Sequence, residues 1–173
     1  MTLRWGIIGT GGIARAFTKD LKFADGHSVV AVGSRTLDKS KIFAAEFNVT
    51  PYGSYEELVR ADIDAVYVAT PHPMHAPNTI LALNNGKPVL CEKPFAVNGR
   101  ESKAMIAAAR ENKLLLVEAM WSRFLPHYAR VRELIAEGAI GEIRLIEADH
   151  GQPLPANPYY RLHADRKSTR LNS

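Results

Sequence analysis

The sequence predicts an α/β protein built on a doubly wound parallel sheet, followed by the start of an α+β domain with a mostly antiparallel sheet. Three observations support this prediction. Short apolar segments alternate with helix-like segments up to about residue 120. The apolar segments are apolar throughout, which is typical of strands covered on both faces. A glycine-rich turn follows the first of them, where such sheets bind ligands.

The first half of the predicted sheet begins with the apolar residues 3–8, which end in glycines and indicate a buried strand. Residues 13–23 carry apolar side chains at spacings of four, which indicates a helix. The β-branched residues 29–32 predict a second strand. Residues 38–47 return to helical spacing. This alternation requires parallel strands joined by helical crossovers.

The middle of the chain repeats the alternation. A short third strand is expected to begin at Tyr52, followed by a short helix at residues 55–60. Residues 65–69 lack charged side chains and predict the fourth strand. Residues 77–85 are helical in pattern and end at Gly86, a residue type that commonly ends helices by adopting a left-handed conformation.

A fifth strand (89–91), an alanine-rich helix (100–112) and a sixth strand (114–117) complete the predicted sheet. The nucleotide-binding domain is therefore expected to span residues 1–120. Residues 121–164 are expected to begin a substrate and dimerisation domain.

Two elements are predicted in this second region. Residues 128–137 form an amphipathic helical pattern. Residues 141–150 alternate apolar and polar side chains, which predicts a long strand.

The last nine residues, 165–173, do not continue this pattern. Their sequence, Asp-Arg-Lys-Ser-Thr-Arg-Leu-Asn-Ser, equals the in-frame translation of a common sequencing adapter. We therefore expect a non-native tail on the front part of a longer protein; the alternative is a genuine basic tail. Without these residues the charge falls from +4 to +2, because 22 − 3 = 19 basic residues face 18 − 1 = 17 acidic ones. That small, dispersed charge gives no reason to expect a nucleic-acid partner.

The composition indicates a globular protein. Hydrophobic residues make up 46% of the 173 residues, and no apolar run has the length of a membrane span. The chain starts almost directly on its first strand, without a secretory signal. Its single cysteine excludes an internal disulfide and is typical of a reducing compartment. We therefore expect a cytoplasmic protein with no membrane partner.

The turn after the first strand carries the clearest functional signal. It reads Gly9-Thr10-Gly11-Gly12-Ile13-Ala14, between a predicted strand and a predicted helix. In the Rossmann dinucleotide-binding fold the first glycine permits the tight turn, the second lets the backbone approach a pyrophosphate, and a small residue lets the helix pack near the strand. The alternative is a turn that needs glycine only for a positive φ.

The end of the second strand suggests which dinucleotide is bound. NAD-binding proteins usually place Asp or Glu here to hold the ribose 2′-hydroxyl. This chain has Ser34 and Arg35 instead, with Lys39 shortly after. These side chains suit a 2′-phosphate, so NADP is favoured over NAD. The alternative for Arg35 is a solvated loop residue.

The fourth strand ends in Thr70, Pro71 and His72, with His75 three residues further on. Ligands bind at the carboxyl ends of strands in such sheets, so these residues are candidates for cofactor contact. Simple loop packing is the alternative. The two histidines lack a third ligand nearby in sequence, so no metal site is predicted.

The fifth strand ends in Cys91-Glu92-Lys93-Pro94. Pro94 disfavours a helical conformation for Lys93, and the bond between them is a candidate for the cis form. Lys93 could hydrogen-bond a substrate hydroxyl and stabilise the alkoxide that develops as hydride leaves. The alternative is a surface lysine paired with Glu92. Cys91 is expected to be a core residue without a catalytic role.

The sixth strand leads into Trp121 and Arg123, which could line a pocket for nicotinamide and substrate. The alternative is a domain hinge packed by Trp121 and Phe124. Both interpretations are compatible.

Taken together, these segments resemble the Gfo/Idh/MocA oxidoreductase family, with the dihydrodiol dehydrogenase and NADP-linked D-xylose dehydrogenase group as the nearest branch. The resemblance covers residues 3 to about 164. It rests on Gly9-x-Gly11-x-Ile13-Ala14, Ser34-Arg35, Ala69-Thr70-Pro71 with His75, Cys91-Glu92-Lys93-Pro94, and Met120-Trp121-Ser122-Arg123-Phe124 with Pro126.

The resemblance implies roles for individual residues. Lys93 matches the catalytic lysine, and Trp121 and Arg123 match pocket positions. The family's second domain continues into a glycine-rich stretch with an acidic residue and a Tyr or His, where this chain instead enters residues 165–173. The implied cofactor positions are Gly9, Gly11, Ser34, Arg35, Thr70, His75 and Glu92.

The resemblance implies that the longer protein is an NADP-dependent oxidoreductase that moves a hydride between nicotinamide and a sugar, polyol or cyclic diol. Its partner is then a small-molecule substrate, and it is expected to form a homodimer through the sheet missing here. This chain alone is expected to bind NADP weakly, to turn over nothing and to aggregate. The alternatives are a non-catalytic NADP-binding sensor and a reductase of a non-sugar carbonyl or imine.

Overall fold

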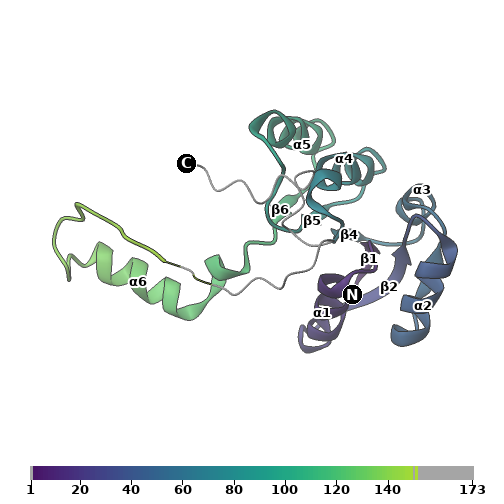
Figure 1. The fold of residues 1–173 in the computed structure, drawn as a ribbon, viewed down its shortest axis with the longest axis horizontal. Coiled ribbons are helices and arrows are strands. Elements are labelled where there is room, and N and C mark those ends of the chain that lie inside the picture. Colours follow the sequence, from purple (N-terminus) through teal and green to yellow (C-terminus); the bar gives the residue numbers. More distant parts are fainter. Residues whose placement is uncertain (1, 150, 152–173) are drawn as a thin grey trace.

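The six described strands of the protein form one parallel sheet in the order β3-β2-β1-β4-β5-β6 (Figure 1). The computed structural model describes residues 2–149 and 151. The predicted doubly wound Rossmann sheet is confirmed, and the strand order reverses at the central strand β1. The strands are β1 (Leu3–Ile8), β2 (His27–Gly33), β3 (Thr50–Tyr52), β4 (Ala65–Val68), β5 (Val89–Cys91) and β6 (Leu116–Glu118).

Helices connect successive strands and pack on both faces of the sheet. Side chains of α1 and α2 share one apolar cluster, and side chains of α3, α4 and α5 share the other. The α-helices are α1 (Gly12–Asp20), α2 (Leu37–Phe47), α3 (Tyr55–Val59), α4 (His75–Asn84), α5 (Gly99–Glu111) and α6 (Pro126–Ala136). Single 3-10 turns occur at η1 (Leu21–Phe23), η2 (His72–Met74) and η3 (Trp121–Phe124).

The centre of the sheet is the most buried part of the protein. All four residues of β4 are buried, as are the last three of β1. Burial on both faces explains why these segments read as unbroken apolar runs rather than alternating ones. The carboxyl ends of β1, β2, β4, β5 and β6 lie along one edge, where the predicted site residues follow them.

The predicted elements of the first 120 residues form close to their expected positions. The predicted 13–23 helix is α1 extended by the 3-10 turn η1. Gly86 ends α4 as expected: its φ is 75°, and its N–H donates to the Leu83 carbonyl at 3.0 Å. The N–H of Lys87 donates to the Ala82 carbonyl at 3.0 Å, which completes a Schellman-type cap.

The predicted strand at residues 141–150 is wrong for the part that the structure describes. Residues 143–149 have no strand assignment, and Leu145 is 75% exposed. A strand exists only where a neighbour accepts and donates its backbone hydrogen bonds, and the described residues place no strand beside this segment. Residue 150, residues 152–164 of the predicted second domain and the tail at 165–173 lie outside the described residues.

Helix α6, predicted for residues 128–137, does form and begins at Pro126. It projects away from the sheet, and none of its residues is buried (Figure 1). Among the described residues, no helix combines the length and hydropathy needed to cross a membrane.

Candidate functional site

The glycine turn joins three strand ends. Gly9 has a φ of 111°, and its N–H donates to the Gly33 carbonyl at 3.0 Å. A Cβ added to Gly9 would lie 2.7 Å from the carbonyl oxygen of Ala69. Gly9 therefore needs both the positive φ and the missing side chain, since β1, β2 and β4 meet around it.

Gly11 is different, because neither packing nor backbone conformation requires a glycine there. Its φ is −75°, and a Cβ at Gly11 or Gly12 would meet no atom within 4 Å. Gly11 is the N-cap of α1, where no side chain makes a capping hydrogen bond. Ala14 is fully buried, so the helix packs closely on the sheet. The start of α1 thus offers backbone N–H groups with room for an anion above them.

A cleft of about 230 Å³ opens beside this turn. Its lining includes Tyr55 and Met74, which the sequence did not point to, and no Asp or Glu among the described residues. It brings together the predicted cofactor positions Gly9, Thr10, Gly11, Ser34, Arg35, Lys39, Thr70 and Pro71.

Arg35 and Lys39 are exposed, whereas Ser34 is buried and its N–H donates to the Tyr52 carbonyl at 3.3 Å. Burial raises the pKa of Tyr55, and the positive charge of Arg35 opposes that shift. Two cations and no carboxylate in the described lining make the cleft suitable for a phosphate group.

His75 is buried and does not line the cleft. The ring is fully buried, with Nδ1 2.8 Å from the Pro94 carbonyl oxygen and Nε2 2.9 Å from the Thr70 carbonyl oxygen. It thus links the loops that follow β4 and β5. Asn78, which the sequence did not point to, donates from Nδ2 to Thr70 Oγ1 at 3.1 Å. Direct contact between His75 and a cofactor stays a prediction.

His72 sits in η2, with its ring edge-on to the His75 ring at a centroid distance of 5.4 Å. No group of three His, Cys, Asp or Glu side chains in residues 2–149 is arranged to hold a metal ion. Cys91 is buried, and burial raises the pKa of its thiol to about 12. Such a thiol is not a nucleophile at neutral pH.

Glu92 and Lys93 follow β5 at the same edge of the sheet. The Tyr67 hydroxyl donates to Glu92 Oε1 at 2.5 Å, and the Lys93 backbone N–H donates to Glu92 Oε2 at 3.0 Å. Burial and the neighbouring carboxylate raise the pKa of Tyr67. The Lys93–Pro94 bond is cis. The Glu92 carboxylate is thus held by Tyr67 and the Lys93 backbone, while the Lys93 side chain is half-buried.

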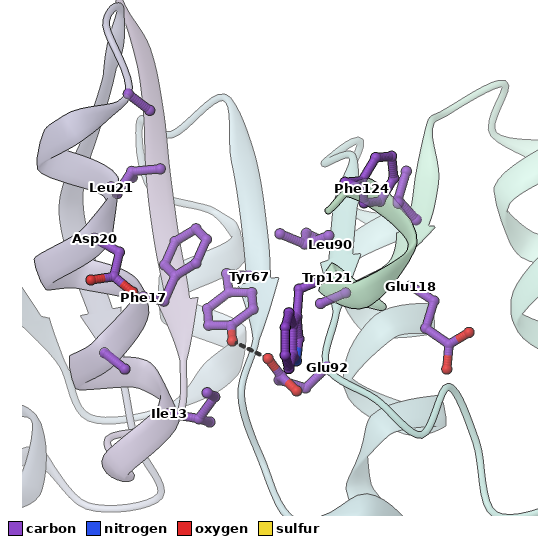
Figure 2. A pocket seen from close by; sticks show the side chains of 14 residues that line it. Ile13, Phe17, Asp20, Leu21, Tyr67, Leu90, Glu92, Glu118, Trp121 and Phe124 are labelled. Atoms are coloured by element: carbon purple, nitrogen blue, oxygen red, sulfur yellow. Dashed lines mark hydrogen bonds between the residues drawn. The ribbon is translucent and has the colours of Figure 1, made fainter. Parts of the chain in front are cut away.

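A second depression, of about 590 Å³, lies on the sheet face that carries α1 (Figure 2). Ile13 lines it at the start of α1, Glu92 at the end of β5, and Trp121 on η3. Arg123 is exposed on the same turn and does not line the depression. The structure therefore places Ile13 and Trp121 by Glu92, apart from the cleft that holds Arg35.

Tyr67 and Asn78 are the polar side chains that sequence reasoning did not identify. One signal was available for Tyr67, because it is the single side chain with a hydroxyl in the buried strand Ala65–Val68, and buried hydroxyls need a partner. The partner itself lies 25 residues away and could not be read from spacing.

Comparison with known proteins gives consistent matches. The model of an oxidoreductase family with an NAD-binding Rossmann fold matches residues 3–120. Trans-1,2-dihydrobenzene-1,2-diol dehydrogenase of Xenopus laevis is 45% identical over 162 residues, covering 91% of this chain and 49% of that protein. The Mus musculus enzyme is 44% identical with the same coverage. The chain thus spans about half the length of these relatives.

Solved structures of oxidoreductases are also similar to this chain. KijD10, a 3-ketoreductase from Actinomadura kijaniata in complex with NADP, superposes with a TM-score of 0.76 and 37% identity. The match covers 83% of this chain and 47% of that one.

Proposed function

Because this chain belongs to the Gfo/Idh/MocA oxidoreductase family, we propose that it is the cofactor-binding part of an NADP-dependent dehydrogenase acting on CH–OH groups. The proposed substrate is a sugar, polyol or cyclic diol. The similarity to dihydrodiol dehydrogenases and to an NADP-bound 3-ketoreductase supports this class. The observation that carries the proposal is the cationic cleft beside the glycine turn.

The residues of that cleft fit NADP. The N-terminus of α1, with Gly11 as its N-cap, would hold the pyrophosphate on backbone N–H groups. Arg35 and Lys39 would hold the 2′-phosphate, and Ser34 belongs to the same lining. A carboxylate at the end of β2 would repel that phosphate, and none lines the cleft among the described residues. The unphosphorylated coenzyme would lack the main charged contact.

The chemistry is proposed to occur at the end of β5. When bound, the nicotinamide ring supplies the hydride acceptor or donor. Lys93 binds the substrate hydroxyl and exchanges a proton with it at Nζ, which stabilises the oxygen as its charge develops. Glu92 orients this segment through the Lys93 N–H. Trp121 and Arg123 belong to the proposed substrate pocket.

Titration calorimetry of the present chain with NADPH and NADH tests the cofactor. We expect measurable NADPH binding and much weaker NADH binding. Arg35→Ala should weaken NADPH binding roughly 10- to 100-fold while barely changing NADH binding, since charge-assisted hydrogen bonds are worth about 1.5–3 kcal/mol. Arg100→Ala, on the exposed start of α5, is the matched control. If no binding heat is detected with NADPH or with NADH, the proposal is refuted. If NADH binds more tightly than NADPH, the choice of NADP is wrong.

Turnover by the longer protein separates an enzyme from a non-catalytic sensor. Lys93→Met should abolish turnover and leave NADPH binding intact. Unchanged biological output of that variant would favour the sensor. A panel of sugars, diols and imines would identify the substrate class. Homodimerisation beyond the described residues and a cytoplasmic location stay predictions.

A further inference from the structure

The depression of about 590 Å³ is an apolar groove on one face of the sheet (Figure 2). Its floor is a row of three side chains in register across neighbouring strands: Tyr67, Leu90 and Val117. Phe17 of α1 stacks on Tyr67 at a centroid distance of 3.9 Å and forms one wall. The opposite wall is η3, with Trp121 and Phe124.

The groove exists because part of the sheet lacks a helix. On this face, α1 and α2 pack with β1, β2 and their neighbours, while α3, α4 and α5 cover the opposite face. No described α-helix fills the remaining space over β4, β5 and β6 on the α1 face. Trp121 and Phe124 at its border are 65% and 73% exposed. A doubly wound sheet normally buries both faces completely.

Helix α6 has the surface that such a groove requires. Its large apolar residues Tyr128, Val131 and Ile135 are exposed and occupy positions i, i+3 and i+7, which share one helix face. The opposite face carries Arg130, 3.1 Å from Glu133 and 3.5 Å from Glu137. The helix is thus amphipathic, with its polar face occupied by ion pairs and its apolar face uncovered.

Position and charge connect this helix to the groove. The wall residues Trp121 and Phe124 immediately precede α6, and Leu125 between them and the helix is extended at ψ 138°. Eleven residues make a helix of about 16 Å, which suits a groove that follows strands of three or four residues. The charged side chains that line the groove are acidic: Asp20, Glu92 and Glu118. Arg132 flanks the apolar face of α6.

We propose that α6 of the same chain folds back into this groove. Rotation about the segment between Met120 and Pro126 brings its apolar face onto Tyr67, Leu90 and Val117. The helix then completes the layer that begins with α1. This inference does not depend on NADP binding or on the reaction.

Disulfide trapping in the present chain tests the proposal. Val117→Cys on the floor is combined in turn with Tyr128→Cys, Val131→Cys and Ile135→Cys. The native Cys91 does not interfere, because it is buried and its pKa is raised to about 12. The matched controls carry Val117→Cys with Arg130→Cys, Glu133→Cys or Glu137→Cys, on the ion-paired face. Circular dichroism of the reduced variants establishes that each is folded.

We expect at least one pair from the apolar face to close as a monomer, at least tenfold faster than every control pair. Equal rates on both faces would overturn the proposal, since an unattached helix samples all orientations. Crosslinks only between two chains would also overturn it, because they would indicate a helix contributed by a second copy.

A single-cysteine measurement gives an independent readout. With Val117→Cys alone, alkylation should be slow, and adding Ile135→Asp should accelerate it at least tenfold by releasing the helix. Arg130→Asp in the same background should leave the rate unchanged. No acceleration by Ile135→Asp would refute the proposal.

Discussion

Gly9 is the residue at which the sheet and the cationic cleft that includes Arg35 and Lys39 depend on one another. Its φ is 111°, and a Cβ at this position would come within 2.7 Å of the Ala69 carbonyl oxygen, so there is no space for a side chain. Gly9→Ala should therefore lower the free energy of unfolding by about 1–3 kcal/mol, from strain and from displaced strand ends. Urea unfolding followed by circular dichroism measures this loss.

Gly12→Ala is the matched control for that substitution. Gly12 begins α1, and a Cβ there would meet no atom within 4 Å. The change should preserve or slightly raise stability, since alanine favours a helix by about 1 kcal/mol over glycine. Equal losses from the two substitutions would contradict the role assigned to Gly9.

Tyr67 is the second residue whose contribution to stability a single substitution can measure. Its hydroxyl is a donor to the buried Glu92 carboxylate. Tyr67→Phe should cost about 1–3 kcal/mol in unfolding free energy, because the Glu92 carboxylate loses a charge-assisted hydrogen bond. Tyr128→Phe, on the half-exposed surface of α6, should change stability by less than about 0.5 kcal/mol.

The same hydrogen bond predicts that the protein becomes less stable at alkaline pH. The pKa of Tyr67 is raised in the folded protein, so the native state keeps this proton where an unfolded chain releases it. The stability contribution is complete below the ordinary tyrosine pKa of about 10 and is lost as the pH rises above it. Absorbance titration at 295 nm, compared between wild type and Tyr67→Phe, measures the pH at which Tyr67 ionises in the folded protein. A Tyr67 that ionises near pH 10 in folded protein would contradict the assignment.

Individual site residues differ in how far sequence could predict them. That Gly9, Gly11 and Arg35 line one cleft was predictable, because the turn and the end of β2 are defined by a few neighbouring residues. Their contact with a cofactor stays a prediction. The roles of Tyr67 and His75 depend on contacts with Glu92 and Pro94, which lie 25 and 19 residues away. Which of these distant residues meet depends on the order of the strands in the sheet, and the spacing of residues along the sequence does not predict it.

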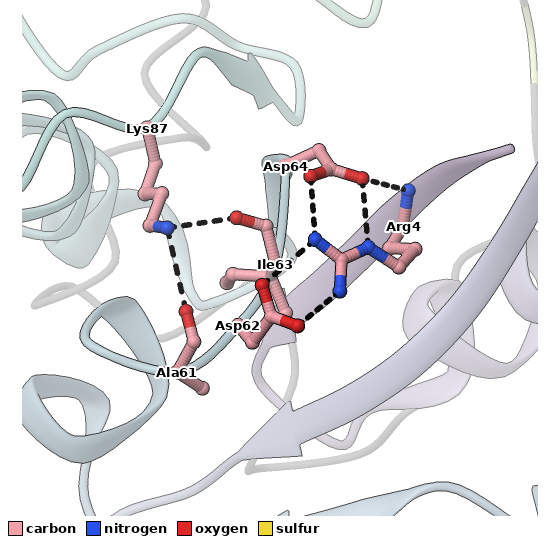
Figure 3. Close-up of polar contacts among 6 residues, drawn as sticks. All are labelled: Arg4, Ala61, Asp62, Ile63, Asp64 and Lys87. Atoms are coloured by element: carbon pink, nitrogen blue, oxygen red, sulfur yellow. Dashed lines mark hydrogen bonds and ion pairs between the residues drawn. The ribbon is translucent and has the colours of Figure 1, made fainter. Parts of the chain in front are cut away.

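At the scale of elements, the amino ends of β1 and β4 are joined by a cluster of charges (Figure 3). The Arg4 guanidinium binds the Asp64 carboxylate, with Nη2 to Oδ1 at 2.9 Å, and also contacts Asp62. Lys87 Nζ donates to the Ala61 and Ile63 carbonyls at 3.3 and 2.7 Å. These bonds tie the loop before β4 to β1, at the edge of the sheet opposite the cationic cleft.

This charge cluster predicts that the protein loses stability at acid pH. Hydrogen bonds from Arg4 lower the pKa of Asp64 to about 2, below its ordinary value of 3.8. Its contribution is complete above about pH 4 and is lost as the pH falls toward 2. Urea midpoints of wild type and Arg4→Met should therefore differ at pH 6 and converge below pH 4. Arg144→Met, which removes an exposed ion pair with Glu142, should give no such pattern.

Helices and strands were predictable from sequence where the elements that pack against them lie among the described residues. The six strands and the helices between them each have a neighbour that buries their apolar face. Residues 141–149 and α6 carry equally clear periodicity, yet the first forms no strand and the second is uncovered. Periodicity predicts which face of an element is apolar; it does not supply the partner.

At the scale of the whole molecule, the domain boundary near residue 120 stays a prediction. Every described strand lies within residues 3–118, and the last residue in sequence that lines the cationic cleft is Met74. A chain ended after Met120 should therefore fold and bind NADPH within about threefold of the longer chain, a difference below about 1 kcal/mol. It should be less stable by about 2–4 kcal/mol if α6 covers the groove, from lost apolar burial.

Circular dichroism, urea unfolding and NADPH titration of the two chains measure these effects together. A chain ended after Arg110 serves as the control, because it also lacks β6 and exposes the edge of β5. It should lose most of its cooperative unfolding. If the chain ended after Met120 were unfolded as well, the first domain would have to extend past the boundary and include α6. If it folded but lost NADPH binding, the cofactor site would require residues beyond the cleft, most directly Trp121 and Arg123.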